Sequence, residues 1–277
     1  MANIAITGAN GFVGRHVLDH LLRENHNIKI LVKKSKIRNQ YQPNIKVIEL
    51  NDLFHEKAET LKQILKGVEI LIHLAWYTEP NQYLTSPLNI DCLTGTLNLA
   101  KAFVEAGGRR FIGIGTCFEY DTDQCLLSIN TPLNPKSIYA ASKSSAFQLL
   151  TQIFSVSEVE FSWCRLFYLY GDGEDTRRLV AYIKQKLSIG ETVELTSGNQ
   201  IRDFLDVQDA AKMIVEESLG SLQGPINICS GIPITIRQIA ENIADHFGRR
   251  DLLKFGARPD NLIDPPCVVG VKGRLVI

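Results

Sequence analysis

Short apolar runs alternate with longer amphipathic stretches over the first 171 residues of the chain. Runs with the length and composition of buried strands occur at 3–7, 28–33, 45–50, 68–75, 110–116 and 159–171. Apolar residues recur with helical spacing at 13–25, 58–67, 93–108 and 139–154. Strands and helices that alternate in this way predict right-handed βαβ units. The expected fold class is therefore α/β, with a doubly wound parallel sheet covered by helices on both faces.

The alternating pattern loosens beyond residue 171, where polar loops that contain glycine interrupt it. We expect residues 1–171 to form the main domain, and 205–228 to return to its sheet. The segments 172–204 and 229–277 are expected to form a smaller C-terminal lobe. Ligands of α/β sheets bind outside the carboxyl ends of the strands, so this lobe is the expected place for a substrate.

The composition is that of an ordinary globular protein. The chain has 277 residues, 45% of them hydrophobic, and 30 basic residues balance 30 acidic ones. A neutral surface gives no general attraction to nucleic acid or to anionic membranes. The first residues lack the basic and apolar regions of a signal peptide, and no apolar run approaches the length of a membrane span. We therefore expect a cytoplasmic protein whose partners are neither nucleic acid nor membrane.

Cysteines and histidines suggest little metal or disulfide chemistry. The six cysteines form no C-x-x-C pair, so reduced thiols are expected. His16 and His20 share one face of the first predicted helix, but no third ligand is evident. Their pattern places them on the polar side of an amphipathic helix. We expect both side chains to be solvated and predict no metal site.

A glycine-rich turn joins the first predicted strand to the first helix. Its glycines stand three residues apart in AITGANGFVGRHV. A phosphate must approach backbone N–H groups at the helix N-terminus, and a side chain at these positions would block that approach or the turn. This context favours dinucleotide binding on a Rossmann-type fold over an ordinary turn. The expected cofactor contacts are Gly8, Asn10, Gly11, Phe12, Val13 and Gly14.

The end of the second predicted strand indicates which dinucleotide binds. An acidic residue there would bind the ribose 2′-hydroxyl and repel a 2′-phosphate. This chain instead reads LVKKSKIR, whose basic and hydroxyl side chains favour a phosphate. An ordinary basic surface loop is the alternative. We predict NADP, with NAD as the second candidate, and contacts from Arg15, Lys33, Lys34, Ser35 and Arg38.

A tyrosine and a lysine four residues apart suggest proton transfer. Tyr139 and Lys143 lie in SIYAASKSS, and positions i and i+4 of a helix share one face. A nearby ammonium group favours the phenolate and lowers the pKa of a phenol. Thr116 ends a predicted parallel strand, where α/β sheets bind their ligands. Tyr182 and Lys186 repeat the spacing without such a strand end, so we expect them to form a surface pair.

These motifs together resemble the extended short-chain dehydrogenase/reductase family, of the NAD-dependent epimerase/dehydratase type. The resemblance spans essentially the whole chain and includes TGANGFVG, NDL, HLA, GT, YAASK, RLFYLYG and RDFLDVQDAA. It implies that Thr116, Tyr139 and Lys143 form the catalytic set, and that the last two also contact the cofactor. It further implies cofactor contacts from Asp52, Leu53, Leu74, Ala75 and Trp76.

The resemblance also implies a substrate and an assembly. The substrates of this family are mostly nucleotide sugars, and relatives pair through two helices into homodimers. The substrate contacts expected here are Cys117, Phe118, Tyr168, Arg178 and Arg202. Arg202 would contact the diphosphate, and a salt bridge with Asp203 or Asp206 is the alternative. The chain stops where related chains usually continue into another helix, which suggests a shortened C-terminus.

The residues that follow Thr116 indicate the subfamily. Nucleotide-sugar 4,6-dehydratases of this family carry an Asp-Glu pair there, whereas Cys117 and Phe118 cannot perform that acid–base work. Tyr168 also replaces an asparagine that is common in epimerases and dehydratases. The pattern is closest to CDP-abequose synthase-like nucleotide-sugar 4-ketoreductases. We therefore predict NADPH-dependent reduction of a 4-keto-6-deoxy nucleotide sugar. The alternatives are a nucleotide-sugar 4-epimerase with tightly bound NAD and a non-catalytic NADP-sensing regulator.

Overall fold

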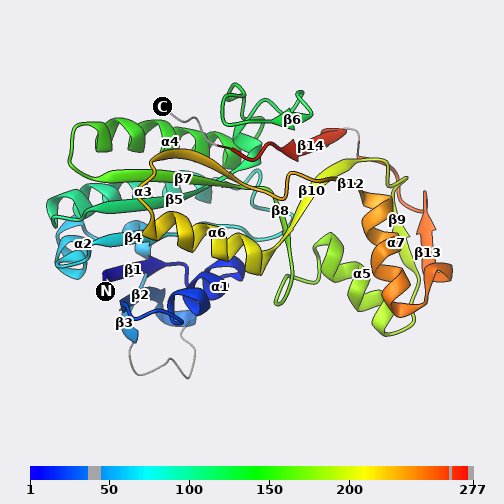
Figure 1. Cartoon of the computed structure of the whole chain (residues 1–277), viewed down its shortest axis with the longest axis horizontal. Helices are drawn as coiled ribbons and strands as arrows, with labels where there is room; N and C mark the ends of the chain where they lie inside the picture. The colour runs from blue at the N-terminus through cyan, green and yellow to red at the C-terminus, as the bar shows by residue number, and fades with distance from the viewer. Residues whose placement is uncertain (37–44, 262–263, 274–277) are drawn as a thin grey trace.

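A computed structural model describes residues 1–36, 45–261 and 264–273. Within these ranges, seven parallel strands form the main sheet in the order β11-β7-β5-β4-β1-β2-β3 (Figure 1). The strands are β1 (Asn3–Thr7), β2 (Asn27–Lys33), β3 (Ile45–Leu50), β4 (Ile70–His73), β5 (Arg110–Thr116), β7 (Glu160–Leu166) and β11 (Gly224–Ile228). The predicted α/β class with a doubly wound parallel sheet is confirmed.

Helices cover both faces of this sheet. They are α1 (Phe12–Leu21), α2 (Ala58–Leu65), α3 (Leu88–Glu105), α4 (Ile138–Ser155) and α6 (Val207–Leu219). Apolar residues of α1 and α6 pack against one face, and those of α2, α3 and α4 pack against the other (Figure 1). Two apolar cores therefore enclose the sheet, as its continuous apolar strands require. In the described part of the chain, no helix is both long and apolar enough to cross a membrane.

The remaining strands and two further helices form a second region, which extends from the centre to the right of Figure 1. Its strands are β6 (Leu126–Leu127), β8 (Tyr168–Tyr170), β9 (Val193–Leu195), β10 (Ile201–Asp206), β12 (Pro233–Thr235), β13 (Leu253–Phe255) and β14 (Cys267–Gly270). The order β12-β10-β14-β6 forms one sheet, with β8 also beside β10, and β13 pairs with β9. Helices α5 (Leu179–Ser188) and α7 (Ile236–Phe247) pack with β9 and β13 around a separate apolar cluster. The proposed boundaries between two domains stay a prediction.

The apolar run at 159–171 divides into two strands, although one was expected. β7 ends at Leu166, and β8 begins at Tyr168 in a different sheet. The Phe167 N–H donates to the Ile228 carbonyl oxygen at 3.2 Å, so the chain stays beside β11 up to that residue. From Tyr168 onward its backbone pairs with β10 instead. The single-strand prediction was wrong because the chain changes sheets at Phe167.

His16 is buried, although a solvated side chain was expected. It is 2% exposed, and its ring nitrogens lie 3.1 Å from the Asp172 carbonyl oxygen and 2.9 Å from the Gln208 side-chain nitrogen. His20, one turn later, is partly buried. The prediction was wrong because α6 and the loop after β8 cover this side of α1. Both contacts come from residues that are remote in the sequence.

A disulfide links Cys125 and Cys267, although reduced thiols were expected throughout. The two residues are separated by 142 positions in the sequence, and their Cα atoms lie 4.8 Å apart. They meet because β14 pairs with β6, which a local cysteine pattern does not reveal. The other four cysteines, Cys92, Cys117, Cys164 and Cys229, are buried and lie outside this disulfide.

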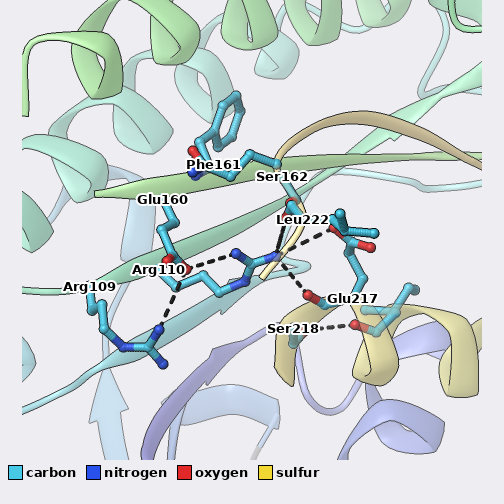
Figure 2. A network of polar contacts seen from close by, with 10 residues as sticks. Arg109, Arg110, Glu160, Phe161, Ser162, Glu217, Ser218 and Leu222 are labelled. Carbon is cyan, nitrogen blue, oxygen red and sulfur yellow. Dashed lines mark hydrogen bonds and ion pairs between the residues drawn. The ribbon is translucent and has the colours of Figure 1, made fainter. Parts of the chain in front are cut away.

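Arg110, the first residue of β5, joins the main sheet to α6 (Figure 2). Its side chain is fully buried, and Nη1 donates to Glu160 Oε2 at 2.8 Å. Nη2 donates to the Glu217 carbonyl oxygen at 2.9 Å and to Ser162 Oγ at 3.2 Å. The Glu217 carboxylate, which is 6% exposed, lies 3.5 Å from the same nitrogen. One guanidinium group on β5 therefore satisfies acceptors from the neighbouring strand β7 and from helix α6.

Arg110→Met is expected to lower the free energy of unfolding by about 2–3 kcal/mol, because buried acceptors lose a charged donor. Urea denaturation of wild type and variant measures the difference. Arg109→Met is the matched control, since Arg109 is half exposed and its nitrogen lies 3.4 Å from Glu160. That change should leave stability close to wild type. Equal effects of the two variants would contradict the assigned role of Arg110.

Candidate active site

Close backbone contacts shape the turn after β1. Gly8 has a φ of +74°, and a Cβ atom there would lie 2.6 Å from the Ala75 backbone nitrogen. A Cβ atom on Gly14 would lie 2.1 Å from the Gly8 carbonyl oxygen. The Gly11 N–H donates to that same oxygen at 2.9 Å, and α1 begins at Phe12. The turn thus keeps side chains away from a helix N-terminus, which is the geometry that a dinucleotide phosphate needs.

A cavity of about 840 Å³ extends from this turn, past the carboxyl ends of β4 and β5, to the second region. Its volume falls within the range of ligand pockets, roughly 300–1,000 Å³. Most of the predicted site residues line it. They are Gly8, Asn10, Gly11, Phe12, Val13, Gly14, Lys33, Asp52, Leu53, Leu74, Ala75, Trp76, Thr116, Cys117, Phe118, Tyr139, Lys143, Tyr168, Arg178 and Arg202.

Some predicted contacts to a 2′-phosphate do not line this cavity. Arg15 donates instead to the Asp172 carbonyl oxygen, in the loop after β8. The expected cofactor contact from Arg15 stays a prediction. Lys34 and Ser35 lie exposed in a short 3-10 helix, η1 (Lys34–Lys36). Arg38 lies outside the described residues.

Lys33 and Asp52 lie together at one end of the cavity. Lys33 ends β2, and its Nζ lies 3.9 Å from Asp52 Oδ2. Asp52 also accepts a hydrogen bond from the Phe54 N–H at 3.0 Å and so caps η2 (Leu53–His55). Both side chains are about half exposed, at 53% and 41%. Water weakens such an ion pair, so Lys33 can still bind an anion that enters the cavity.

The fold brings Thr116, Tyr139 and Lys143 to the carboxyl end of β5. Thr116 is the last residue of that strand. Tyr139 and Lys143 stand on the first two turns of α4, whose N-cap is Ser137. Lys143 Nζ donates to the Ile114 carbonyl oxygen, in the same strand, at 2.6 Å. Tyr139 and Lys143, on one face of α4, therefore face the end of β5, where the sequence predicted the site.

Burial keeps Tyr139 in its acid form. The side chain is 8% exposed, and its ring packs edge-on against Tyr83 with the centroids 4.9 Å apart. Desolvation raises the pKa of the Tyr139 phenol, and Tyr83 raises it further, whereas a hydrogen bond with Thr116 acts in the opposite direction. The expectation of a lowered pKa is therefore wrong for the protein alone. A protonated phenol is the form that a proton donor needs.

Lys143 is a buried ammonium group whose pKa lies close to neutral pH. It is 4% exposed. Desolvation lowers the pKa of Lys143 to about 7, and the Glu119 carboxylate acts in the opposite direction. Near neutral pH the group therefore exists in both its charged and its neutral form. Small changes around Lys143 will shift that balance.

Glu119 and Arg165 form an ion pair behind Thr116 that the sequence-based predictions missed. Their side chains are at most 1% exposed, and Arg165 Nε donates to Glu119 Oε2 at 2.8 Å. Glu119 also accepts hydrogen bonds from the Thr116 N–H at 2.8 Å and from Trp163 Nε1 at 3.0 Å. Together with the Thr116 hydroxyl, this forms a capping box around η3 (Cys117–Glu119). The T-x-x-E spacing in GTCFEYD was the available signal.

Aromatic and basic side chains form the wall where substrate contacts were expected. The Tyr168 and Phe118 rings pack edge-on with centroids 6.0 Å apart, and the Arg202 guanidinium carbon lies 5.3 Å from the Tyr168 centroid. The alternative, a salt bridge from Arg202 to Asp203 or Asp206, does not form between these described residues. Asp203 accepts hydrogen bonds from three backbone N–H groups, and Asp206 caps α6. Arg202 instead lines the cavity.

Cys117 and Arg178 complete this wall. Burial raises the pKa of the Cys117 thiol to about 12, so the thiol stays protonated at neutral pH. It can pack against a substrate but cannot act as a general base there. Arg178 stands at the N-cap position of α5 and presents a positive charge to the same cavity.

The second tyrosine–lysine pair lies away from the cavity. The Tyr182 hydroxyl accepts a hydrogen bond from Arg258 Nη2 at 2.9 Å. Lys186 pairs with Glu191 at the surface. Neither residue of the pair is among those that line the cavity in the described structure. Tyr182 and Lys186 are thus occupied by local contacts, and they provide a natural control for the first pair.

Comparisons with known proteins agree with this geometry. The 4-dehydrogenase for dTDP-6-deoxy-L-talose (NAD(+)) from Aggregatibacter actinomycetemcomitans is 26% identical over 98% of this chain and 100% of its own length. A Methanobrevibacter ruminantium UDP-N-acetylglucosamine 4-epimerase structure matches 98% of this chain and 89% of its own, with a TM-score of 0.87 and 23% identity. The Thermus thermophilus UDP-glucose 4-epimerase complex with NAD matches 98% and 90%, with a TM-score of 0.84 and 20% identity. These two structures share the fold.

The model of the NAD dependent epimerase/dehydratase family matches residues 4–218. That range starts in β1 and ends in α6, so it contains the glycine turn, Thr116, Tyr139 and Lys143. The resemblance drawn from the sequence motifs is confirmed. The chain belongs to the NAD-dependent epimerase/dehydratase family of extended short-chain dehydrogenase/reductases, whose members are enzymes.

Proposed function

We propose that the protein reduces the 4-keto group of a nucleotide-linked 4-keto-6-deoxy sugar with NADPH. The similar proteins are named for nucleotide-sugar chemistry, as 4-epimerases, decarboxylases and a 4-dehydrogenase. The 4-dehydrogenase aligns along its full length with this chain. Its name describes oxidation at C4 of a 6-deoxy sugar nucleotide, and the reverse of that reaction is the proposed reduction.

The observation that carries the proposal is the set of residues beside Thr116. Elimination of water needs an acid and a base next to the sugar, but Cys117 and Phe118 occupy those positions in the cavity wall. Glu119, the next carboxylate, is buried and paired with Arg165. What remains around Thr116 is a proton donor and a cation, which suits hydride transfer and not dehydration.

The residues of the site have distinct roles in this reaction, and Lys143 has two: it would hold the cofactor, and its charge would favour loss of the proton from Tyr139. The glycine turn and Lys143 would hold the cofactor, and bound NADPH would supply the hydride for C4. The Thr116 hydroxyl orients the carbonyl oxygen of the sugar. Tyr139 donates its proton to that oxygen as the C4 hydroxyl forms, which its protonated phenol allows. Arg202 would bind the diphosphate of the nucleotide sugar, as a guanidinium fork matches phosphate oxygens.

A screen of 4-keto-6-deoxy nucleotide sugars with NADPH and NADH tests this proposal. We expect one molecule of NADPH to be oxidised for each sugar reduced, with a new C4 hydroxyl in the product. Interconversion of C4 epimers without net cofactor oxidation, by protein that retains its cofactor on purification, would establish the 4-epimerase alternative instead. Cofactor binding without turnover of any substrate would favour the regulator.

NADPH is expected to bind at least about tenfold more tightly than NADH, because a charge-assisted phosphate contact contributes more than 1.4 kcal/mol. Lys33 lines the cavity and supplies that charge. Lys33→Ser should therefore weaken NADPH binding and leave NADH binding nearly unchanged in isothermal titration calorimetry. Lys66→Ser is the matched control, since Lys66 is exposed at the end of α2. A wild-type preference for NADH would refute the choice of NADP.

A homodimer is expected, formed through α3 and α4. These helices pack against each other and expose large apolar side chains: Leu88, Ile90, Ile138 and Leu149 are each at least 42% exposed. Burial of such residues against a second copy removes apolar surface from water. Sedimentation velocity at micromolar concentration should give the mass of a dimer, and Ile90→Lys should shift it towards the monomer. A monomeric wild type would rule this interface out.

A further inference from the structure

Both tryptophans of the chain lie beside the Lys143 ammonium group. The sequence contains two tryptophans. Lys143 Nζ lies 3.7 Å from the ring centroid of Trp76 and 5.9 Å from that of Trp163. Cation–π contacts extend to roughly 6 Å, so the Trp76 contact is a close one. Trp76 lines the cavity after the end of β4, whereas Trp163 is buried within β7.

Within the described part of the chain, the titratable neighbours of Lys143 influence it without forming an ion pair with it. Glu119, on η3, favours the charged ammonium, but its carboxylate is paired with Arg165. Cys92, on α3, stays a neutral thiol because burial raises its pKa to about 11. His73, on β4, stays neutral because burial lowers its pKa to about 3. The close contacts of the ammonium are therefore a carbonyl oxygen and an indole face.

The Trp76 ring is itself held firmly. Its Nε1 donates to Asn89 Oδ1 at 2.8 Å. Asn89 is buried, and its Nδ2 donates to the Tyr83 carbonyl oxygen at 2.7 Å. The Tyr83 ring in turn packs against Tyr139. The segment that positions the proton donor thus also fixes the indole against Lys143.

We propose that Trp76 is a positioning residue, whose indole face holds the Lys143 ammonium in place and in its charged form where a carboxylate would otherwise be needed. The ring quadrupole attracts a cation most strongly where water is excluded, as it is around this buried group. An indole also leaves Lys143 without a competing carboxylate, so the ammonium stays available to ribose hydroxyls. The inference rests on the proposed cofactor role of Lys143, but its first test needs neither cofactor nor substrate.

The first test is a fluorescence titration of the protein without ligands. Because the ammonium contacts Trp76, its deprotonation should change the tryptophan emission with a midpoint near pH 7, where the pKa of Lys143 lies. The change should disappear in Lys143→Met and become much smaller in Trp76→Phe, which retains only the more distant Trp163, 5.9 Å from Lys143 Nζ. Wild-type emission that shows no change with pH overturns the proposal, as does a change that survives in Lys143→Met.

The second test separates charge from packing. Loss of the indole should lower the pKa of Lys143 by roughly one unit in Trp76→Leu and by less in Trp76→Phe. The loss of NADPH affinity in the leucine variant should then be about tenfold larger at pH 8 than at about pH 5.5, where the ammonium group is charged in wild type and variant alike. An equal loss at both pH values would overturn the proposal, because packing alone does not depend on pH. Wild-type protein that binds no NADPH would refute the proposed function, and the fluorescence titration would then decide the inference by itself.

Discussion

Tyr139→Phe is expected to lower turnover by about 10²–10⁴-fold, the usual contribution of general acid catalysis, while NADPH affinity barely changes. Phenylalanine keeps the ring that packs against Tyr83 and removes the proton donor alone. The loss should appear in kcat, because the substrate still binds but its carbonyl oxygen receives no proton. Steady-state kinetics on a substrate that the wild type reduces measure the effect, and calorimetry measures the cofactor affinity.

The second tyrosine–lysine pair supplies the matched control. Tyr182→Phe and Lys186→Met make the same substitutions in a pair with the same spacing. In that pair the side chains bind Arg258 and Glu191. Both variants should turn over at the wild-type rate. Lys143→Met should damage turnover and cofactor binding together, because Lys143 is assigned to both tasks. Near-normal turnover of Tyr139→Phe, or equal harm from Lys186→Met and Lys143→Met, would mean that the wrong pair has been identified.

The features that could be predicted from the sequence are those that depend on neighbouring residues. The glycine turn follows from a strand, three glycines and a helix in succession, and the structure places their backbone contacts within one turn. Tyr139 and Lys143 share a helix face because they are four residues apart. Thr116 lies at a strand end because the apolar run stops there. Each prediction needed only local periodicity.

The features that could not be predicted depend on contacts between remote segments. Burial in the folded protein raises the pKa of Tyr139. The spacing of the tyrosine and the lysine carries no information about that burial. Cys125 meets Cys267 across 142 positions through the pairing of β6 with β14. Arg165 meets Glu119 because β7 lies beside β5. In each case the sequence contained the residues but not the strand order that joins them.

Arg165→Met is expected to lower the free energy of unfolding by about 3–5 kcal/mol, the cost of leaving a buried charge without its partner. Glu119 is fully buried, and without Arg165 its carboxylate would keep only neutral donors, the Thr116 N–H and the Trp163 indole. Urea denaturation measures the loss. Arg177→Met is the control, because Arg177 pairs with exposed carboxylates and its removal should leave the unfolding midpoint close to wild type.

The double variant Glu119→Gln with Arg165→Met separates charge from geometry. Glutamine keeps an oxygen that can accept the Thr116 N–H but carries no charge that needs a cation, so much of the lost stability should return. Turnover should stay below wild type, because the neutral amide no longer favours the charged form of Lys143 from behind the strand. A double variant as unstable as Arg165→Met alone would show that Arg165 stabilises the fold through packing. In that case the ion pair would not be what holds the Thr116 backbone in place.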